Sequence, residues 1–391
     1  MKEVERSYWL AFSVFPGIGP KRFSDLIAHF GSAEKAWQAP RPRLGRRIGE
    51  KLADKFEKFR LRFSLDNYKR ILLAEGVSFL TLNDKNYPSL LKQIENPPFV
   101  LYIKGDPAIL RASVSESRSN SSRLRDAPHG ASLRSNNIIA IVGTRRVTSY
   151  GREVTELFTQ QLVNTGFTIV SGLAMGVDAI AHKTTIDNGG KTIAVLGNGV
   201  DICYPTSNKW LYDSLIKENG CIVSEYPIGQ QPTKGSFPSR NRIIAGLSQA
   251  VLVTEGAEDS GALITAKFAL ELGRKVFAVP GPITSSLSKG PYKLIQKGAK
   301  LVTNADDILK EFKVQSFGLA QEKITTQKSK VEDATKEELE ILKLLENETL
   351  QFDEIVRKSG FGSAKVGMLL SMLEMKGSLI VDNVGLYKIS S

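Results

Sequence analysis

The chain has 391 residues, of which 41% are hydrophobic and 24% are charged, and its formal net charge is +12. This composition is that of a folded globular protein and excludes a wholly disordered or collagen-like chain. No run of 18 apolar residues occurs and the N-terminus lacks the order of a secretory signal, so we expect a cytoplasmic protein that does not enter a membrane.

The positive charge is concentrated near the N-terminus. Residues 1–70 carry 16 Lys and Arg against 8 Asp and Glu, whereas residues 137–312 carry 18 against 15. A basic excess favours a polyanionic partner, most often nucleic acid, although it also serves solubility. Two cysteines and three histidines are too few for a zinc site or a disulfide framework, so we expect no metal and no cofactor.

Residues 1–75 are predicted to form an N-terminal helical domain. Within it, residues 16–22 (PGIGPKR) separate two segments of helical spacing. The glycines permit a tight turn whose backbone N–H groups can face a phosphate, and cations follow on the next helix. This pattern resembles a helix-hairpin-helix (SAM-like) motif and predicts backbone contacts by Gly17, Gly19 and Lys21. It also fits a plain connection between two packed helices.

Residues 76–312 are predicted to form a Rossmann-like α/β core with a doubly wound, mostly parallel sheet. Short β-branched, apolar runs alternate with segments of helical spacing at 153–164, 177–187 and 261–272. Nearly continuous apolar strands indicate a parallel sheet that is covered on both faces. The expected strands are Ile138–Val142, Phe167–Val170, Thr192–Leu196, Cys221–Ser224, Ala250–Thr254 and Lys275–Val279.

Two polar segments interrupt the chain. Residues 112–137 are rich in Ser, Arg and Asn and are predicted to be a mobile insertion, and residues 313–334 are predicted to be a linker. Residues 335–391 then show three helical segments, the last at 363–375, followed by two short strands. Three helices and a hairpin predict a winged-helix domain.

Small residues follow several of the predicted strands and open one helix, at the edge where a doubly wound sheet binds its ligands. Helix N-termini at this edge favour an anion, so we expect a phosphate site. Two nucleotide-binding signatures do not fit. Residues 197–202 lack the third glycine of the dinucleotide fingerprint. Residues 185–192 resemble the end of a P-loop, but they precede a strand instead of opening a helix. The expected site residues in these loops are Gly143, Thr144, Arg145, Ser171, Gly172, Ser260 and Gly261.

The sequence predicts no catalytic residue. Asp178 and His182 stand four residues apart and could pair as an acid and a base. However, no nucleophile or set of metal ligands accompanies them, so a structural hydrogen bond is the favoured interpretation.

A basic stretch that includes an aromatic residue occupies residues 234–248 (KGSFPSRNRIIAGLS). Lys234, Arg240 and Arg242 supply charges that pair with phosphates, and Phe237 supplies a flat ring on which a base can stack. Single-stranded nucleic acid requires both kinds of group. Either arginine could instead pair with an acid and brace the loop.

At this point the sequence resembles a known family, the bacterial DNA-processing protein A (Smf) family. The resemblance covers about residues 80–312, and the N-terminal and C-terminal domains also resemble that family's accessory domains. It rests on a series of motifs, VGTRRVTSYG (142–151), SGLAMGVDAIAH (171–182), AVLGNGVDICYP (194–205), FPSRNRIIAGLS (237–248), SGALITAKFALELGR (260–274) and AVPGPI (278–283).

The resemblance implies a non-enzymatic protein that binds single-stranded DNA, forms a homodimer and loads RecA recombinase onto incoming DNA during natural transformation. It implies that Arg145, Lys234 and Phe237 are the arginine, the basic residue and the stacking residue of the DNA pocket. Two features depart from the family. Tyr292 stands where the family has asparagine after Gly290, and residues 112–137 form an insertion.

Two other functions remain open. A nucleoside-monophosphate phosphoribohydrolase of the lysine-decarboxylase-like group resembles the predicted sheet, but residues 255–265 lack its Pro-Gly-Gly-x-Gly-Thr loop, and the next acid is Glu271. A sequence-specific regulator would read DNA through the winged helix. Residues 335–391 carry 7 Lys and Arg against 9 Asp and Glu, and Lys365 is the single cation of the third helix, which favours a protein-contact module instead.

Overall fold

The computed structural model describes residues 3–113, 137–312, 335–345, 348–376, 378–381 and 385–389. The chain divides into two compact units, Met1–Gln315 and Ser316–Ser391. Residues 114–136 of the expected insertion and the expected linker 313–334 lie outside the described residues. None of the helices in the described ranges is long and apolar enough to cross a membrane.

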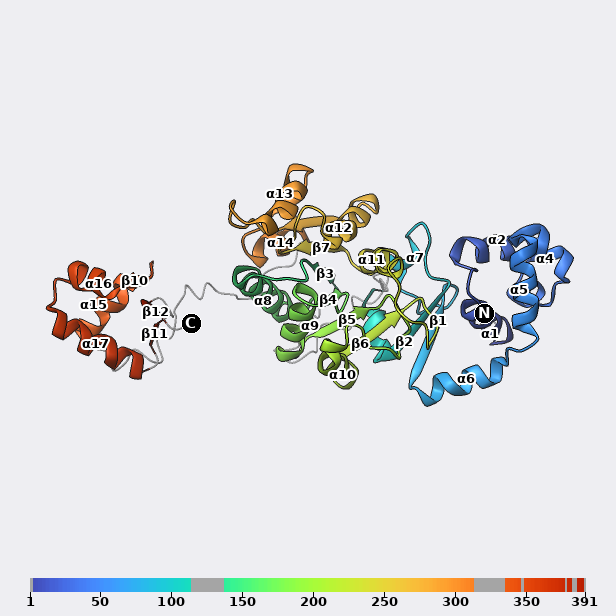
Figure 1. Ribbon diagram of the computed structural model, residues 1–391, viewed down its shortest axis with the longest axis horizontal. Coiled ribbons are helices and arrows are strands. Elements are labelled where there is room, and N and C mark those ends of the chain that lie inside the picture. The colour runs from blue at the N-terminus through green and yellow to red at the C-terminus, as the bar shows by residue number, and fades with distance from the viewer. Residues whose placement is uncertain are drawn as a thin grey trace, which may run out of the picture. The chain divides into compact units, whose positions relative to one another are not determined.

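The N-terminal helices, blue in Figure 1, pack around a core that contains many aromatic rings. Phe12 stacks on Phe56 with ring centroids 5.2 Å apart, and Trp37 meets Phe56 edge-on at 5.0 Å. Phe23 stacks on Phe99, next to the sheet, at 4.1 Å, so the helices and the sheet share one hydrophobic core. The helices are α1 (Glu3–Val14), α2 (Pro20–Phe30), α3 (Ala33–Gln38), α4 (Arg41–Ile48), α5 (Glu50–Arg60) and α6 (Leu65–Ala74).

A nine-stranded sheet with the order β1-β2-β6-β5-β4-β3-β7-β8-β9 forms the centre of the first unit. The strands from β3 to β9 pair in parallel, which confirms the predicted fold class, and β1 and β2 add an antiparallel edge. The sequence analysis missed β1, β2 and β9, because the first two precede the strand–helix alternation and β9 has two exposed residues. The strands are β1 (Val77–Thr81), β2 (Val100–Gly105), β3 (Ile138–Val142), β4 (Thr168–Ser171), β5 (Lys191–Val195), β6 (Gly220–Ser224), β7 (Ala250–Val253), β8 (Lys275–Ala278) and β9 (Lys300–Leu301).

Alternating side chains of β3 pack on opposite faces of the sheet. Ile138, Ala140 and Val142 lie in the hydrophobic cluster that α11, α12 and α13 complete, whereas Ile139 and Ile141 lie in the cluster of α8, α9 and α14. Both faces are therefore covered by helices (Figure 1). The helices of this part are α7 (Ser89–Lys92), α8 (Ser149–Asn164), α9 (Val177–Asp187), α10 (Lys209–Lys217), α11 (Ser236–Leu247), α12 (Gly261–Glu271), α13 (Lys289–Gln296) and α14 (Ala305–Phe312).

The second unit is a winged-helix domain, as the sequence predicts. Its buried core contains Ile341, Ile355, Leu369 and Leu379. One strand more than expected is present, because β10 pairs with β12 on the side opposite to β11. The elements are α15 (Lys336–Leu345), β10 (Leu350–Gln351), α16 (Phe352–Ser359), α17 (Ser363–Met375), β11 (Leu379–Val381) and β12 (Leu386–Ile389).

Candidate nucleic-acid interface

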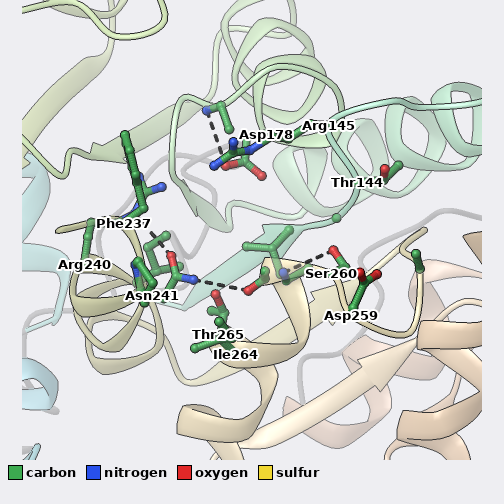
Figure 2. Close-up of a pocket in the computed structure, with 18 of the residues that line it drawn as sticks. Thr144, Arg145, Asp178, Phe237, Arg240, Asn241, Asp259, Ser260, Ile264 and Thr265 are labelled. Carbon is green, nitrogen blue, oxygen red and sulfur yellow. Dashed lines mark hydrogen bonds between the residues drawn. The ribbon is translucent and has the colours of Figure 1, made fainter. Parts of the chain in front are cut away.

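The sheet has a topological switch point at β3. The chain runs from β3 to β4, β5 and β6 on one side and then returns to place β7 on the other side of β3. Ligands of doubly wound folds bind at the carboxyl ends of the strands at such a point. A cleft of about 710 Å³ opens there, and Figure 2 shows side chains from the loops after β3 and β7 and from α11 around it.

Most of the site residues expected from the sequence line this cleft. Gly172 lines a smaller recess beside it. Ser171 lies in neither lining, because its buried hydroxyl donates to the Ile141 carbonyl at 2.6 Å, and Arg242 lies in neither because it points toward Glu225. The expected residues in the cleft are Gly143, Thr144, Arg145, Lys234, Phe237, Arg240, Ser260 and Gly261.

The glycines of the loops after β3 and β4 serve packing between the loops. A Cβ atom on Gly143 would lie 2.6 Å from Val177 Cγ2, and one on Gly172 would lie 2.5 Å from Arg240 Nη1. A side chain at either position would therefore collide with the protein itself, so these two glycines allow the close contact between neighbouring loops. Gly261 differs, because no atom lies within 4 Å of the place where its Cβ would be, so the start of α12 is open.

Helix α11 begins at Ser236, within the basic stretch 234–248. Ser236 and Thr233 exchange hydrogen bonds at its start, with the Thr233 N–H donating to Ser236 Oγ at 3.1 Å and the Ser236 N–H donating to Thr233 Oγ1 at 3.2 Å. Pro238 is tolerated because it falls in the first turn, where no intrahelical N–H bond is needed. Phe237 therefore lies in the first turn, and Arg240 lies one turn further, facing the sheet.

Arg240 is a buried structural cation as well as a lining residue. Its side chain is 5% exposed, and its Nη1 donates to the carbonyl of Gly172 at 2.6 Å and to the carbonyl of Val195. Burial lowers the pKa of Arg240 to about 10, the Asp178 charge opposes this shift, and the nearby Arg145 charge adds to it. Arg240 thus holds the loop after β4 against β5.

Arg242 is an ion-pair partner instead of an exposed phosphate ligand. Its Nη2 lies 2.5 Å from Glu225 Oε2, and the two side chains are 16% and 11% exposed. Burial raises the pKa of Glu225, and the Arg242 charge opposes that shift. The sequence left two roles open for Arg242, pairing with a phosphate or pairing with an acid. The structure shows the second, because Arg242 pairs with Glu225.

Three cations of the cleft lack an acidic partner. Arg145, Arg146 and Lys234 are exposed, and none of them forms an ion pair with a described residue. The Arg145 guanidinium lies 5.7 Å from the centre of the Phe237 ring. On the Tyr204 side, the centres of the Tyr204 and Phe237 rings are 5.5 Å apart. The sequence analysis missed Arg146 and Tyr204, although both belong to the quoted motifs.

The acidic and histidine side chains near the cleft hold its loops. Asp178 accepts the backbone N–H groups of Gly172 at 3.1 Å and Ala174 at 3.4 Å, and burial raises its pKa. His182 Nδ1 pairs with Thr192 Oγ1 at 2.7 Å, and burial lowers its pKa to about 3. Asp178 and His182 therefore have separate structural partners, as the favoured interpretation of the sequence expects.

Tyr292, which stands where the resembled family has asparagine, has a structural role. Its hydroxyl donates to the Gly281 carbonyl and so ties α13 to the loop after β8. Gly290 cannot carry a side chain, because a Cβ atom there would lie 2.4 Å from the Gly256 carbonyl oxygen.

The expected hairpin near the N-terminus connects α1 and α2. Gly17 has φ +104°, and Arg22 Nη1 donates to its carbonyl at 2.6 Å, which fixes the turn. Gly19 precedes α2 without a side-chain cap and has open space around it, and Lys21 is exposed. Lys21 and Arg22 are thus both exposed at the hairpin, and Arg22 also closes the turn.

Comparison with known proteins gives consistent matches over the chain. The family model "DNA recombination-mediator protein A" matches residues 78–126 and 129–313, and that of the DprA winged helix domain matches residues 325–380. Protein Smf of Synechocystis is 40% identical over 311 residues, which are 79% of this chain and 73% of that protein. DNA processing protein DprA of Bacillus subtilis is 42% identical over 62% of this chain and 74% of that protein.

A solved structure agrees with these sequence matches. DNA processing protein A from Streptococcus pneumoniae is 34% identical, and the match has a TM-score of 0.63 and covers 78% of this chain and 97% of that one. The chain is therefore a member of the DNA recombination-mediator protein A (DprA/Smf) family, whose role is in DNA processing and recombination.

Proposed function

We propose that the protein binds single-stranded DNA in the cleft, with little sequence preference, and acts as a recombination mediator that protects incoming DNA and loads RecA recombinase during natural transformation. The observation that carries the DNA-binding part is the convergence of Arg145, Lys234 and Phe237 on one cleft at the switch point. The RecA partner, the homodimer and the cytoplasmic location are proposed on family membership alone.

Single-stranded DNA fits the cleft better than duplex DNA. Phe237 is partly exposed in the cleft, which Arg145 and Lys234 also line, and its ring centre lies 5.7 Å from the Arg145 guanidinium. A base reaches such a ring only when it is unpaired and unstacked, whereas the cations accept phosphates of any sequence. The ring and the cations together therefore favour a flexible single strand.

The start of α12 provides a further place for a phosphate. The Ser260 hydroxyl accepts the Ala262 N–H at 3.3 Å, and Gly261 leaves the backbone open to the cleft. Asn241 Nδ2 donates to the Gly261 carbonyl at 3.2 Å and so fixes this loop against α11 (Figure 2). Backbone N–H groups at a helix start favour an anion, and here they face the same cleft as Arg145.

We propose a binding protein instead of an enzyme. Glu255, which follows β7, uses its carboxylate to accept the Thr148 N–H at 3.0 Å and the Thr148 hydroxyl at 2.6 Å. It is 3% exposed, and it caps the start of α8. Asp178 is engaged with the backbone of its own loop. The two carboxylates that follow β4 and β7 at this edge are therefore both engaged in holding loops, and Asp259 is the exposed acid of the cleft lining. This engagement of Asp178 and Glu255 counts against the phosphoribohydrolase alternative.

The N-terminal hairpin is proposed as a second, weaker DNA contact through Gly17, Gly19 and Lys21. Its support is the open backbone at Gly19 beside the exposed Lys21. Because Arg22 is occupied in closing the turn, this contact has fewer available charges than the cleft.

A salt titration with a labelled oligothymidine tests the proposal. Arg145→Ala and Lys234→Ala should each weaken binding and lower the slope of log affinity against log salt by about 0.7, the value for one phosphate contact on a single strand. Lys191→Ala is the matched control, because Lys191 is an exposed cation at the amino end of β5, opposite to the cleft. Duplex DNA should bind less well.

Circular dichroism establishes that each variant is folded. If the folded Arg145→Ala and Lys234→Ala variants bind with wild-type affinity and wild-type slopes, DNA does not bind in the cleft. The N-terminal hairpin then becomes the leading candidate, and Lys21→Ala is the variant to measure.

A further inference from the structure

A small recess opens at the side of the cleft. It has a volume of about 60 Å³, and it lies between the loop after β4, the loop after β5 and the first turns of α11. Arg145, Phe237 and Arg240 line both the recess and the cleft, so the two are continuous. A cavity of this size holds a few water molecules or the edge of a planar ring, and it is too small for a whole nucleotide.

Two large side chains at this recess are exposed to solvent. Tyr204 is 45% exposed and Met175 is 48% exposed, and both line the recess. The Tyr204 ring lies 5.5 Å from the Phe237 ring, with an angle of 32° between the planes. Neighbouring exposed apolar groups mark a binding surface, and an exposed aromatic ring is the face on which a base stacks.

Arg240 brings unused hydrogen-bond donors to the same recess. Its Nη1 is engaged with two carbonyl oxygens, and its Nε donates to Asn241 Oδ1 at 3.3 Å. Among the described residues, none accepts a hydrogen bond from its Nη2. The residue is 5% exposed, but Nη2 is not one of the fully enclosed polar atoms, so solvent or a ligand reaches it. A guanidinium has five N–H donors, and those of Nη2 are left to a partner from outside the protein. An acceptor from a ligand would satisfy them.

The recess is held in shape by the loop after β4. Leu173 has φ +59°, a strained conformation for a residue with a side chain, and its side chain is fully buried. Asn208 Nδ2 donates to the carbonyls of Leu173 at 3.0 Å and Ala174 at 3.2 Å. Asp178 holds the other side of the loop. These hydrogen bonds hold the backbone of the loop that carries Met175 at the rim of the recess.

We propose that the recess is a base-edge site, in which a pyrimidine of the bound strand stacks on Tyr204 and directs a ring carbonyl oxygen to Arg240 Nη2. This inference rests on the proposed binding of single-stranded DNA in the cleft. Thymine and cytosine both carry a ring carbonyl next to a small ring, whereas adenine has no carbonyl and a larger ring. The bidentate pairing of arginine with guanine requires a fork that Arg240 no longer offers, because its Nη1 and Nε are engaged.

Binding to oligothymidine, oligodeoxycytidine and oligodeoxyadenosine of equal length tests the proposal. Tyr204→Ala should weaken the binding of the two pyrimidine strands about five- to a hundredfold, the range for losing one stacked base, and should weaken the binding of oligodeoxyadenosine less. Tyr204→Phe keeps the ring and should preserve the preference. Trp210→Ala is the matched control, because Trp210 is 53% exposed and lines neither the cleft nor the recess.

The ratio of the affinities separates a base-edge site from a structural role. If Tyr204→Ala weakens all three strands equally, or none of them, the base-edge inference is wrong. Photocrosslinking with an oligonucleotide that carries 5-iododeoxyuridine gives a second measurement. Mass spectrometry should find the crosslink on Tyr204, and crosslinks confined to Phe237 would overturn the inference.

The failure of this inference differs from the failure of the proposed function. If Phe237→Ala and Arg145→Ala lose affinity while Tyr204→Ala binds as tightly as the wild-type protein, the strand lies in the cleft and the recess is not used. Wild-type affinity in all three folded variants removes the cleft as the DNA site altogether.

Discussion

Replacement of Phe237 separates stacking from charge in the cleft. The ring lies in the first turn of α11 and packs next to Gly197, where a Cβ atom would lie 3.2 Å from Phe237 Cδ1. Phe237→Ala removes the ring, and the loss of one base–aromatic stack corresponds to roughly 1–3 kcal/mol, which is a five- to hundredfold loss of affinity. Phe237→Leu keeps apolar contact with Gly197 but has no aromatic face, so its affinity should lie near that of Phe237→Ala.

The assay is fluorescence anisotropy of a labelled oligothymidine at several salt concentrations. Because no charge is removed, the slope of log affinity against log salt should equal that of the wild-type protein in both variants. Folded variants that bind as tightly as the wild-type protein would refute stacking on Phe237. A lower slope would show that the substitution displaces a cation, in which case the loss of affinity does not measure stacking.

Three further outcomes are expected. Truncation after Phe312 should leave DNA affinity within a few-fold, and a hundredfold loss would contradict a protein-contact role for the winged helix. The purified protein should not hydrolyse nucleoside monophosphates or ATP, and turnover that disappears in Glu255→Ala or Asp178→Ala would overturn the binding-protein proposal. Burial lowers the pKa of His182 from 6.5 to about 3 in the folded protein. Its neutral form therefore stabilises the folded state fully above pH 6.5. This contribution to the free energy of unfolding is lost as the pH falls toward 3, by about 1.4 kcal/mol per pH unit. Urea denaturation of the wild-type protein and His182→Gln between pH 7 and 4 measures this difference, and parallel pH profiles would refute it.

The winged helix supports the first of these outcomes through its own surface. Lys365, the cation that the sequence places on α17, pairs with Glu337 at 2.5 Å. The same helix exposes Met368 at 54% and Met372 at 42%. Adaptable apolar side chains without available positive charge suit a protein partner better than a phosphate backbone.

The parallel part of the fold could be predicted because its strands repeat one signal. β3 coincides with the expected run, and α9 has the expected bounds of Val177 and Asp187. Each such strand is covered on both faces, so its apolar run is continuous and stands out from the helices that flank it. β1 and β2 have no such context. They pair with each other in an antiparallel manner, and the partner that joins them to the sheet, β6, lies more than a hundred positions after β2.

The location of the site could be predicted from the sequence, but the role of each side chain in it could not. The order of the strands brings Arg145, Lys234 and Phe237 to one edge, and this follows from the topology. The role of Arg240 depends instead on where α11 begins, and that is decided by the hydrogen bonds between Thr233 and Ser236. Sequence spacing does not reveal these bonds, so it does not show that Arg240 turns toward the sheet.

The arrangement of charge explains why the cleft needs an anion. Arg240 is buried beside Arg145, and the positive charge of Arg145 lowers the pKa of Arg240 in addition to the effect of burial. Two carboxylates of this edge have structural partners, because Asp178 holds a loop and Glu255 holds Thr148, while Asp259 is exposed in the cleft lining. The Asp178 charge offsets part of the repulsion between Arg145 and Arg240, and a phosphate bound at Arg145 adds a second negative charge that favours both cations. A single strand supplies such a phosphate together with an unpaired base that stacks on Phe237.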